Sequence, residues 1–486
     1  MFECRSCLYK VKKNSLSDDY KCPICGASKG DMVLIENNNK DIKYIPLNSK
    51  NPSVVRTLNK CLNCGKCKDI CENYVGINYD KKKTKNKICV HCGQCIINCP
   101  SGALIPRYNY QKVLDIIKRK EKIVIVSTSP AVRVAIGEEF GLDAGEFCEG
   151  KMVSALKNLG FNYVFDTSFG ADMTVIEEAC ELLERKKNNE NLPQFTSCCP
   201  SWVKYIEMYH PKLIKHLSTT KSPIAIQSTL IKEYYSKIIN TSKDNIVTVA
   251  LTPCTAKKYE INRLELKGLT DYVITTSELA LMLKENNINF STLKDEKYDN
   301  ILGTSSGGGL IFGNSGGVSE SILRALYSIL SKNEIPEDFL NIKSIRGQKN
   351  VKDVEAVIEG KHFKVLVCQG LKNIEPYLAK LENNEKIDYD MIEVMNCPGG
   401  CIGGGGQPLV NISKLNEIRD KRINGLYKGE ENKNIRCSLD NKDALDIYKN
   451  FLDLPLSDNS IKYLHTSFRD KSSLLNKEIK WQKITL

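Results

Sequence analysis

The stretch IVTVALTPCTAKK, residues 246–258, runs from a β-rich segment directly into a cysteine motif. Two distant stretches repeat this order, FTSCCPSW at 195–202 and MIEVMNCPGGC at 391–401. In an open α/β sheet, ligands collect beyond the carboxyl ends of the strands. The thiols that we expect to converge there are those of Cys199, Cys254, Cys397 and Cys401. Four thiolates are what a cubane iron–sulfur cluster needs.

The region around these motifs alternates strands and helices from about residue 121 onward. Residues 122–126 and 364–368 are largely apolar runs, which are typical of buried parallel strands. Residues 174–187 and 318–331 have helical patterns between the strands. This order predicts an α/β domain whose site lies at the carboxyl ends of its strands.

Composition limits the classes of protein that fit. The chain has 486 residues, 41% of them hydrophobic, which predicts more than one globular domain. No apolar run is long enough to span a bilayer, and the first residues lack the pattern of a secretory signal. We therefore expect a cytoplasmic protein without a membrane segment. The net charge of +12 favours an acidic redox partner, and the basic residues are not interleaved with aromatics as nucleic-acid binding requires.

The chain has 21 cysteines, and 12 of them fall in the first hundred residues. Disulfides are the alternative to metal binding, but they suit small secreted domains. Most of the early cysteines form C-x-x-C units, so we expect metal or cluster binding in a reducing compartment, such as that of an anaerobe.

Cys4, Cys7, Cys22 and Cys25 form two C-x-x-C knuckles that could hold one metal ion. The second knuckle resembles rubredoxin closely, and Gly26 would let its backbone turn. The first departs from that pattern, because Leu8 stands where glycine is usual. This departure leaves iron and zinc open. The other redox centres expected in the chain favour iron, and a structural zinc ribbon remains the alternative.

Two further cysteine runs, at 61–71 and 89–99, have the C-x2-C-x2-C-x3-C spacing of a two-cluster bacterial ferredoxin. In that arrangement the fourth cysteine of each run binds the cluster of the other run. One [4Fe–4S] cluster would then be held by Cys61, Cys64, Cys67 and Cys99. The second would be held by Cys71, Cys89, Cys92 and Cys95.

The chain therefore divides into five parts. They are a rubredoxin-like module at 1–36, a polar linker at 37–54, a small α+β ferredoxin-like domain at 55–112, the α/β domain at 118–470 and a C-terminal tail at 471–486.

Taken in order, TSCCPSW at 196–202, PCTAKKYE at 253–260 and the glycine-rich run from Glu393 to Pro408 resemble the three signatures of [FeFe]-hydrogenases. The ferredoxin-like runs match that family as well, so the resemblance covers about residues 55–470. It implies reversible reduction of protons to H2 at an H-cluster. This cofactor is a [4Fe–4S] cubane joined to a two-iron subsite that carries CO, cyanide and a bridging dithiolate.

The resemblance also implies roles for residues. Cys199, Cys254, Cys397 and Cys401 would bind the cubane, with Cys401 bridging to the two-iron subsite. Cys198 would pass protons, its alternative being an inert buried thiol. Lys257 would donate to a cyanide ligand. The remaining residues expected near the two-iron subsite are Ser129, Pro130, Thr252, Pro253, Phe312, Met395 and Gly403.

Helix geometry supports a proton path. We expect Asp172 to cap a helix in which Glu178 lies within the apolar stripe. Glu178, Glu181 and Arg185 share one face of it. An ordinary exposed Glu–Arg pair is the alternative. The family resemblance implies a relay through Cys198, Glu178, Ser218, Glu181 and Arg185.

Four positions near the site depart from the family pattern. Thr252 stands where methionine is usual, Ser129 and Asn396 stand where alanine is common, and Ile224 stands where glutamine is common. Residues beside a metal site tune its reduction potential and the access of small molecules to it, so we expect an altered catalytic bias, rate or response to oxygen.

The favoured interpretation is a monomeric hydrogenase whose electrons come from an acidic ferredoxin or another small carrier, and whose assembly needs hydrogenase maturases. Two alternatives remain. One is a low-turnover hydrogen sensor, although no appended signalling domain is visible. The other is a non-enzymatic iron–sulfur assembly protein, against which the presence of Cys198, Lys257, Glu178 and Met395 argues.

Overall fold

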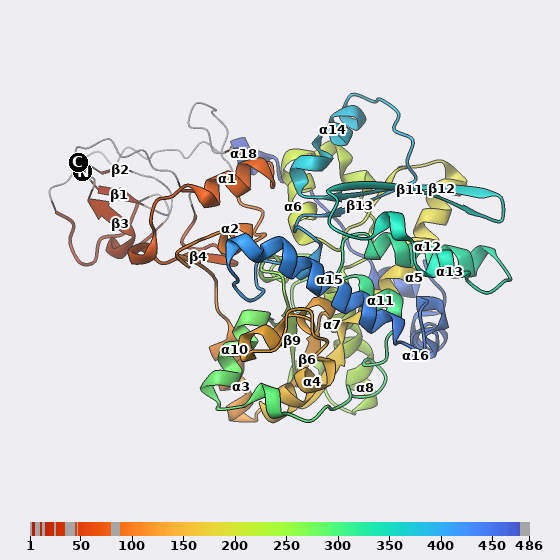
Figure 1. Cartoon of the computed structure of the whole chain (residues 1–486), viewed down its shortest axis with the longest axis horizontal. Coiled ribbons are helices and arrows are strands. Elements are labelled where there is room, and N and C mark those ends of the chain that lie inside the picture. Colours follow the sequence, from red (N-terminus) through yellow and green to blue (C-terminus); the bar gives the residue numbers. More distant parts are fainter. Residues whose placement is uncertain are drawn as a thin grey trace.

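A computed structural model gives the fold and describes residues 2–4, 10–11, 15–23, 26–34, 44–45, 47–78 and 88–476. Two four-stranded sheets form the large domain, where the sequence pattern had not separated them (Figure 1). The first sheet is entirely parallel. Its strands, in spatial order, are β10 (Tyr272–Thr275), β9 (Ile246–Thr252), β6 (Ile123–Thr128) and β7 (Tyr163–Asp166).

The second sheet is mixed. Its strands, in spatial order, are β11 (Val351–Ile358), β12 (Lys361–Gln369), β13 (Met391–Met395) and β8 (Gln194–Phe195). β11 and β12 form an antiparallel hairpin, and the other pairs are parallel. The apolar runs predicted as strands are therefore strands of two sheets, and the prediction of an α/β fold with parallel strands is confirmed.

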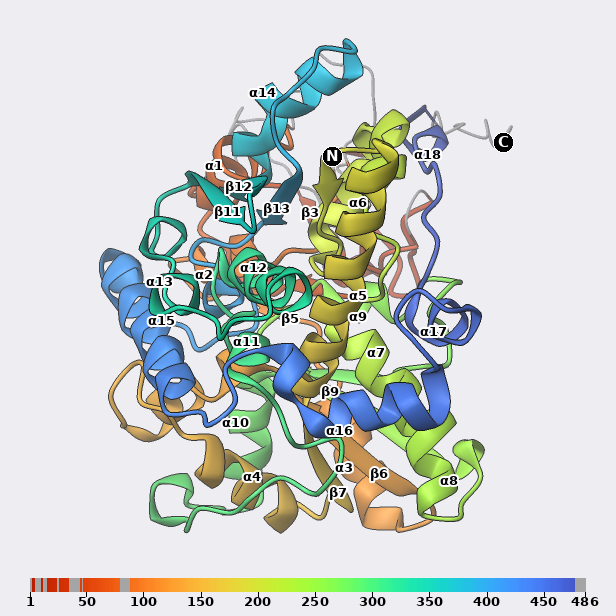
Figure 2. The ribbon, with the colours of Figure 1, turned by 90° about the vertical axis from the view of Figure 1, so that its right-hand side faces the viewer.

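Helices cover and join the two sheets. α5 (Thr167–Asn188) contacts both α7 (Pro223–Leu230) and α12 (Gly317–Leu330). α6 (Pro200–Tyr209) begins directly after Cys199, within the first cysteine motif. Figure 2 shows α12 beside α5. α15 (Leu415–Glu431) crosses the front of the molecule in Figure 1.

The start of α5 corrects one prediction. Its N-cap is Asp166, which accepts a hydrogen bond from the Ser168 backbone N–H, so the helix begins well before Asp172. Asp172 lies inside the helix and is fully buried. Its carboxylate accepts hydrogen bonds from Ser306 and Ser438, which come from distant segments.

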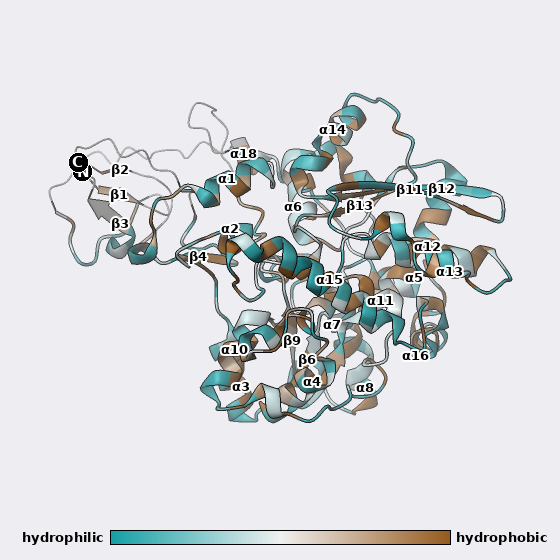
Figure 3. Cartoon of the chain, viewed as in Figure 1, coloured by the Kyte–Doolittle hydropathy of each residue, from teal (hydrophilic) through white to brown (hydrophobic). Residues whose placement is uncertain are grey.

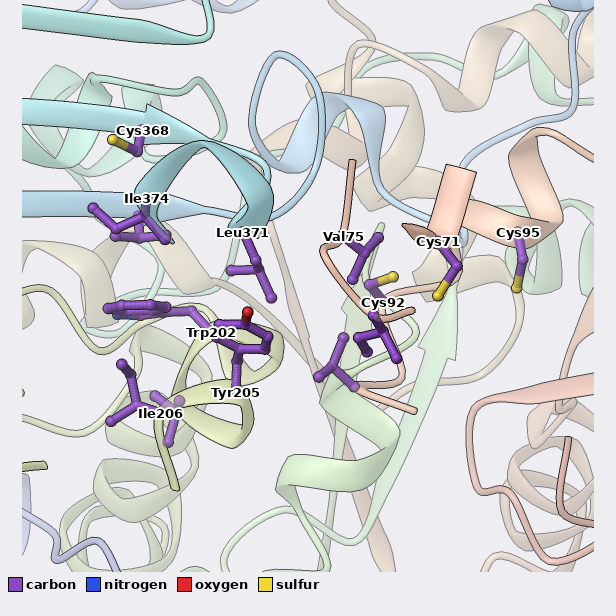
Figure 4. Packing of buried hydrophobic residues seen from close by; sticks show 14 of the residues in the cluster. Cys71, Val75, Cys92, Cys95, Trp202, Tyr205, Ile206, Cys368, Leu371 and Ile374 are labelled. Atoms are coloured by element: carbon purple, nitrogen blue, oxygen red, sulfur yellow. The ribbon is translucent and has the colours of Figure 1, made fainter. Parts of the chain in front are cut away.

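The cysteine-rich region before residue 112 shares a hydrophobic core with the large domain. β4 (Val54–Arg56) pairs with β5 (Leu104–Pro106), and α1 (Lys66–Asn73) lies against α2 (Gln94–Ile97). Figure 4 shows the two ends of this core, with Cys92 and Val75 at one end and Trp202 and Leu371 at the other. The hydropathy colouring of Figure 3 places apolar residues along β6, β9, β12 and β13 in the interior.

At the N-terminus, β1 (Phe2–Cys4) pairs with β2 (Lys10–Val11) and with β3 (Met32–Leu34), in both cases antiparallel. Gly26 has φ of +69°, the left-handed conformation expected of a knuckle glycine. Across the described segments, no helix has the length and apolar character of a membrane span.

Candidate functional site

One cavity lies where β8, β9 and β13 end, and it draws cysteines from both sheets. Cys254 follows β9, Cys397 follows β13, and Cys199 follows the short strand β8. Together with Cys198 and Cys401, these residues line the same cavity. The predicted convergence of the four thiols is therefore present in the fold.

The rest of the cavity wall matches most of the predicted set. These lining residues are Ser129, Pro130, Thr252, Pro253, Lys257, Phe312 and Met395. Gly403 is the exception, because it does not line the cavity and its carbonyl accepts a hydrogen bond from Gln94 Nε2 at 2.9 Å. Gly400 and Gly404 line the cavity in its place.

Lys257 is held at the cavity wall. Its ammonium lies 2.7 Å from a Glu260 carboxylate oxygen and donates to the Cys198 carbonyl at 3.1 Å. Both side chains of the ion pair are less than one-tenth exposed. The pair fixes a buried positive charge beside the cysteines.

Glu178 is fully buried, and neither of its carboxylate oxygens has a hydrogen-bond partner among the described residues. Burial raises its pKa to about 8, and the neighbouring Glu181 adds to the rise. Burial also raises the pKa of Cys198 well above its usual value, and Glu178 is the next cause. These two groups are therefore neighbours that both favour their neutral forms.

Glu181 is the anchored carboxylate of this helix face. Ser218 Oγ donates to its Oε2 at 2.6 Å, and Arg185 Nη2 donates to its Oε1 at 2.7 Å. The Glu181 and Arg185 side chains are only 10% and 11% exposed, so they are not the ordinary surface pair considered as the alternative. Of the five residues of the predicted relay, Ser218, Glu181 and Arg185 are joined by hydrogen bonds. Glu178 neighbours Glu181 and Cys198 but lacks a hydrogen-bond partner among the described residues.

Sequence reasoning missed a branch of polar contacts beside Glu181. The Thr219 backbone N–H donates to Glu181 at 3.2 Å, and the Thr219 hydroxyl lies 2.8 Å from His465 Nδ1. His465 Nε2 lies 3.0 Å from buried Glu177, to which Tyr448 also donates. No local pattern in the sequence marks this link.

The ferredoxin-like cysteines also gather as their spacing predicts. A second cavity is lined by Cys61, Cys64, Cys67 and Cys99. Cys95 is deeply buried, and after burial itself the thiols that raise its pKa are Cys92, Cys89 and Cys71, with Cys67 beyond them. Within the described residues, no group of three or more His, Cys, Asp or Glu side chains is close enough to hold a single metal ion. That finding concerns mononuclear sites, since the bulk of a cluster separates its ligands.

The structure describes two of the four N-terminal knuckle cysteines. Cys4 and Cys22 are buried together with Met32 in one small core. Cys7 and Cys25 lie outside the described residues.

Comparison with known proteins defines the class. Residues 122–405 match the family described as iron only hydrogenase large subunit, C-terminal domain, and residues 416–471 match iron hydrogenase small subunit. The chain therefore belongs to the iron-only, or [FeFe]-, hydrogenases. It is a catalytic subunit of this family, an oxidoreductase that acts on H2.

Individual relatives agree with this family. Iron hydrogenase 1 of Clostridium pasteurianum is 39% identical over 88% of this chain and 77% of its own length. The NADP-reducing hydrogenase subunit HndD of Solidesulfovibrio fructosivorans is 36% identical over 87% of this chain and 75% of its own. The cytosolic Fe-S cluster assembly factor narfl of Danio rerio is more distant, at 28% identity over 80% of this chain and 98% of its own.

A solved structure of apo [FeFe]-hydrogenase HydA1 from Chlamydomonas reinhardtii, a variant, superposes with a TM-score of 0.66 and 32% identity. The match covers 75% of this chain and 99% of that one. The family implies an H-cluster, and the cavity fits one, because four thiol donors line a single space whose other walls are largely apolar.

Proposed function

We propose that Cys199, Cys254, Cys397 and Cys401 hold the cubane of the H-cluster, and that Cys401 also bridges to the two-iron subsite. The observation that carries this proposal is the meeting of these four thiols with Cys198 and Lys257 in one cavity. When bound, the H-cluster supplies the iron site at which protons and electrons combine to form H2. Side chains of this chain carry out the other steps, which are proton transfer, enclosure of the cofactor and binding of the proposed electron-transfer clusters.

Cys198 is the proposed proton carrier at the cavity. Its thiol is neutral because of burial, and it neighbours Glu178, whose carboxyl is also neutral near pH 7. When the Cys198 thiol gives its proton to the cavity, the thiolate that remains can take the proton of the Glu178 carboxyl, and the Glu178 carboxylate is then reprotonated from the side of Ser218 and Glu181. Arg185 holds Glu181 at the outer end of this path. Two adjacent groups that both favour the neutral form suit proton transfer better than permanent charges.

The cavity wall supplies a donor and keeps out water. Lys257 would offer its remaining N–H bonds to a cyanide ligand of the bound cofactor, while Glu260 balances its charge. Pro130, Phe312 and Met395 line the cavity and would present apolar surface to the two-iron subsite. The neighbouring wall residues are Ser129, Thr252 and Pro253. Gly403 does not line the cavity, and its backbone carbonyl accepts a hydrogen bond from the Gln94 side chain.

Electrons are proposed to travel through two [4Fe–4S] clusters. The outer cluster has the ligands Cys61, Cys64, Cys67 and Cys99. The inner cluster has the ligands Cys71, Cys89, Cys92 and Cys95. The support is their grouping at a cavity and in a buried core that is shared with the large domain.

The N-terminal module is proposed to hold iron at Cys4, Cys7, Cys22 and Cys25 as a further electron port. An acidic ferredoxin or another small carrier would meet the basic chain in the cytoplasm, where the thiolates remain reduced. We propose that the protein acts as a monomer and that hydrogenase maturases complete its cofactor.

Infrared spectroscopy of the full chain, produced anaerobically with hydrogenase maturases, tests the central assignment. Sharp CO and cyanide bands that change under H2 are expected. A known hydrogenase matured in parallel controls the preparation. If only the control shows these bands, the protein holds a cubane without the two-iron subsite, and the assembly role would replace the catalytic one. Turnover rate then separates an enzyme from a slow sensor.

A further inference from the structure

The helix α6, which begins directly after Cys199, carries a lysine to the inner set of ferredoxin-like cysteines. Lys204 lies on this helix, and its ammonium donates a hydrogen bond to the backbone carbonyl of Cys89 at 2.8 Å. The same ammonium lies 2.8 Å from His91 Nε2. The His91 backbone N–H in turn donates to the Cys89 sulfur at 3.3 Å. A cation of the large domain is therefore held against the loop that presents the Cys89 thiol.

Lys204 is buried, and its surroundings fix the position of its ammonium. The ammonium lies over the Tyr259 ring, 4.4 Å from the ring centroid, and the His91 ring stacks on that ring at 4.7 Å. His91 Nδ1 lies 3.1 Å from the Asn51 side-chain oxygen, which can only accept a hydrogen bond. His91 Nε2 is then left as an acceptor for Lys204. The ammonium therefore has acceptors on the Cys89 side and an aromatic face beside it.

No carboxylate pairs with this buried charge. Glu207, one turn further along α6, is bound by Arg263 at 2.8 Å and by Lys471 at 2.7 Å. Within the part of the chain that the structure describes, the Lys204 ammonium forms no ion pair. A buried charge is costly unless a charge of opposite sign lies nearby. The proposed site of negative charge that Lys204 contacts is the cysteine set to which Cys89 belongs.

A [4Fe–4S] cluster bound at these cysteines would supply that negative charge. Four thiolates outweigh the positive charge of the iron–sulfur core, so such a cluster is net negative in both redox states and more so when it is reduced. A cation held beside it in a protein interior, where charges are screened less than in water, stabilises the reduced state more than the oxidised state. The cation thereby raises the reduction potential of the cluster.

We propose that Lys204 is the counter-charge of the inner cluster and that it raises the reduction potential of that cluster. This inference rests on the proposed function, because it requires a cluster at Cys71, Cys89, Cys92 and Cys95. Lys204 acts through the cluster, so it is a positioning residue for the supply of electrons to the cavity. A purely structural role, in which Lys204 only joins α6 to the loop at Cys89, would leave the potential unchanged.

The test uses the full chain produced without maturases, which should carry the [4Fe–4S] clusters but no two-iron subsite. Redox titration at neutral pH, followed by electron paramagnetic resonance, compares wild type with K204M and K204Q, which both remove the charge. We expect each variant to lower the reduced-to-oxidised ratio of the inner cluster about tenfold at a fixed potential, a shift of about 59 mV for a one-electron couple. K204R keeps the charge and should stay near the wild-type potential.

K221M is the matched control. Lys221 is also a buried lysine, but its ammonium donates to the Tyr463 carbonyl, away from the cysteine runs. This variant should leave the potential of the inner cluster unchanged. Intact clusters with unshifted potentials in K204M and K204Q would overturn the inference and leave the proposed function standing. A shift in K204R as large as that in K204M would also overturn it, because altered packing and not charge would then be the cause.

A wild-type sample without an inner-cluster signal would overturn the cluster assignment and the inference together. A measurement that needs no variant covers the case in which K204M and K204Q fail to take up the cluster. Wild-type protein grown with lysine deuterated at the ε-carbon should show deuterium modulation of the reduced inner-cluster signal in pulsed resonance spectra. Its absence would place the ammonium too far from the cluster to act as the counter-charge and would contradict the inference.

Discussion

Glu178 differs from Glu181 on the same helix face because its carboxylate has no hydrogen-bond partner among the described residues. Ser218 and Arg185 both bind Glu181, which leaves the Glu178 carboxyl buried and without a hydrogen-bond partner in the described structure. A proton relay needs one member that can change partners, since a fully bonded carboxylate would hold its proton contacts fixed. In the proposed relay, Glu178 would therefore be the member that changes partners and Glu181 the anchored one.

The raised pKa of Glu178 predicts a pH-dependent stability. Its ordinary value of 4.5 rises to about 8 in the folded protein, so the folded state keeps a proton that the unfolded chain releases. The stability from this residue is fully present below about pH 4.5 and is lost as pH rises through 8. Because E178Q cannot ionise, wild type should lose thermal stability relative to E178Q between pH 5 and 8.

Anaerobic thermal unfolding at several pH values measures this difference. Glu184 lies exposed on the same helix, so E184Q serves as the control and should follow the wild-type curve. Parallel curves for wild type and E178Q would mean that Glu178 is ionised at neutral pH.

Removing the Cys198 thiol should stop proton delivery while leaving the clusters in place. A proton-transfer group contributes typically 10²–10⁴-fold to a rate, so C198A should lose about that much H2 evolution. Its iron content and CO and cyanide bands should stay close to wild type. C180A replaces a half-buried cysteine of the same helix as Glu178 and should keep its activity. Substantial turnover by C198A would rule out the thiol as the proton carrier.

At the scale of elements, α5 carries Glu178, Glu181 and Arg185 of the proposed relay, and its N-cap residue is held by a buried ion pair. Asp166 caps the helix through Ser168, and its carboxylate lies 2.7 Å from the Arg133 guanidinium. Neither side chain of the pair is exposed. The position of Glu178 and Glu181 therefore depends on an anchor that lies more than two helical turns away.

D166A should destabilise the protein by about 3–5 kcal/mol, because it leaves the buried Arg133 charge with less compensation and removes the cap. E417A, which breaks an exposed pair with Lys421, should cost less than about 1 kcal/mol. Anaerobic thermal unfolding of both variants, loaded with clusters, provides the comparison. A D166A protein as stable as E417A would show that the ion pair does not anchor the helix.

Local patterns predicted the strands, the cysteines at the strand ends and the buried side of Glu178, because each of these depends on residues a few positions apart. The convergence of the cysteines followed from the general rule that ligands collect beyond the carboxyl ends of the strands. Local patterns failed where contacts with residues distant in the sequence determine the structure. Asp172 resembles a helix cap, yet Ser306 and Ser438 reach it from elsewhere and the helix passes through it. Asn396 stands in the sequence only as an unusual neighbour of Cys397, since no nearby pattern shows that it lines the cavity.

At the scale of the whole molecule, the ferredoxin-like cysteines and the catalytic cavity share one hydrophobic core. Cys71, Cys92 and Cys95 pack in the same cluster of side chains as Trp202 and Leu371 (Figure 4). A flexible link between these parts would let their distance vary and with it the electron-transfer rate. A shared core fixes Cys71, Cys92 and Cys95 relative to the cavity, so electron transfer from the proposed inner cluster would not wait for domain movement.

This arrangement separates electron supply from chemistry at the cavity and predicts that the two can be lost independently. Cys64 is an exposed member of the outer cysteine set, far in sequence from every cavity residue. C64A should disrupt the outer cluster and lower ferredoxin-linked H2 evolution by more than about tenfold. Exchange between D2 and water needs no external electrons, so it should stay near the wild-type rate and serve as the internal control. Loss of both activities together would mean that the outer cluster supports the fold of the cavity, and full ferredoxin-linked activity would mean that electrons enter by another route.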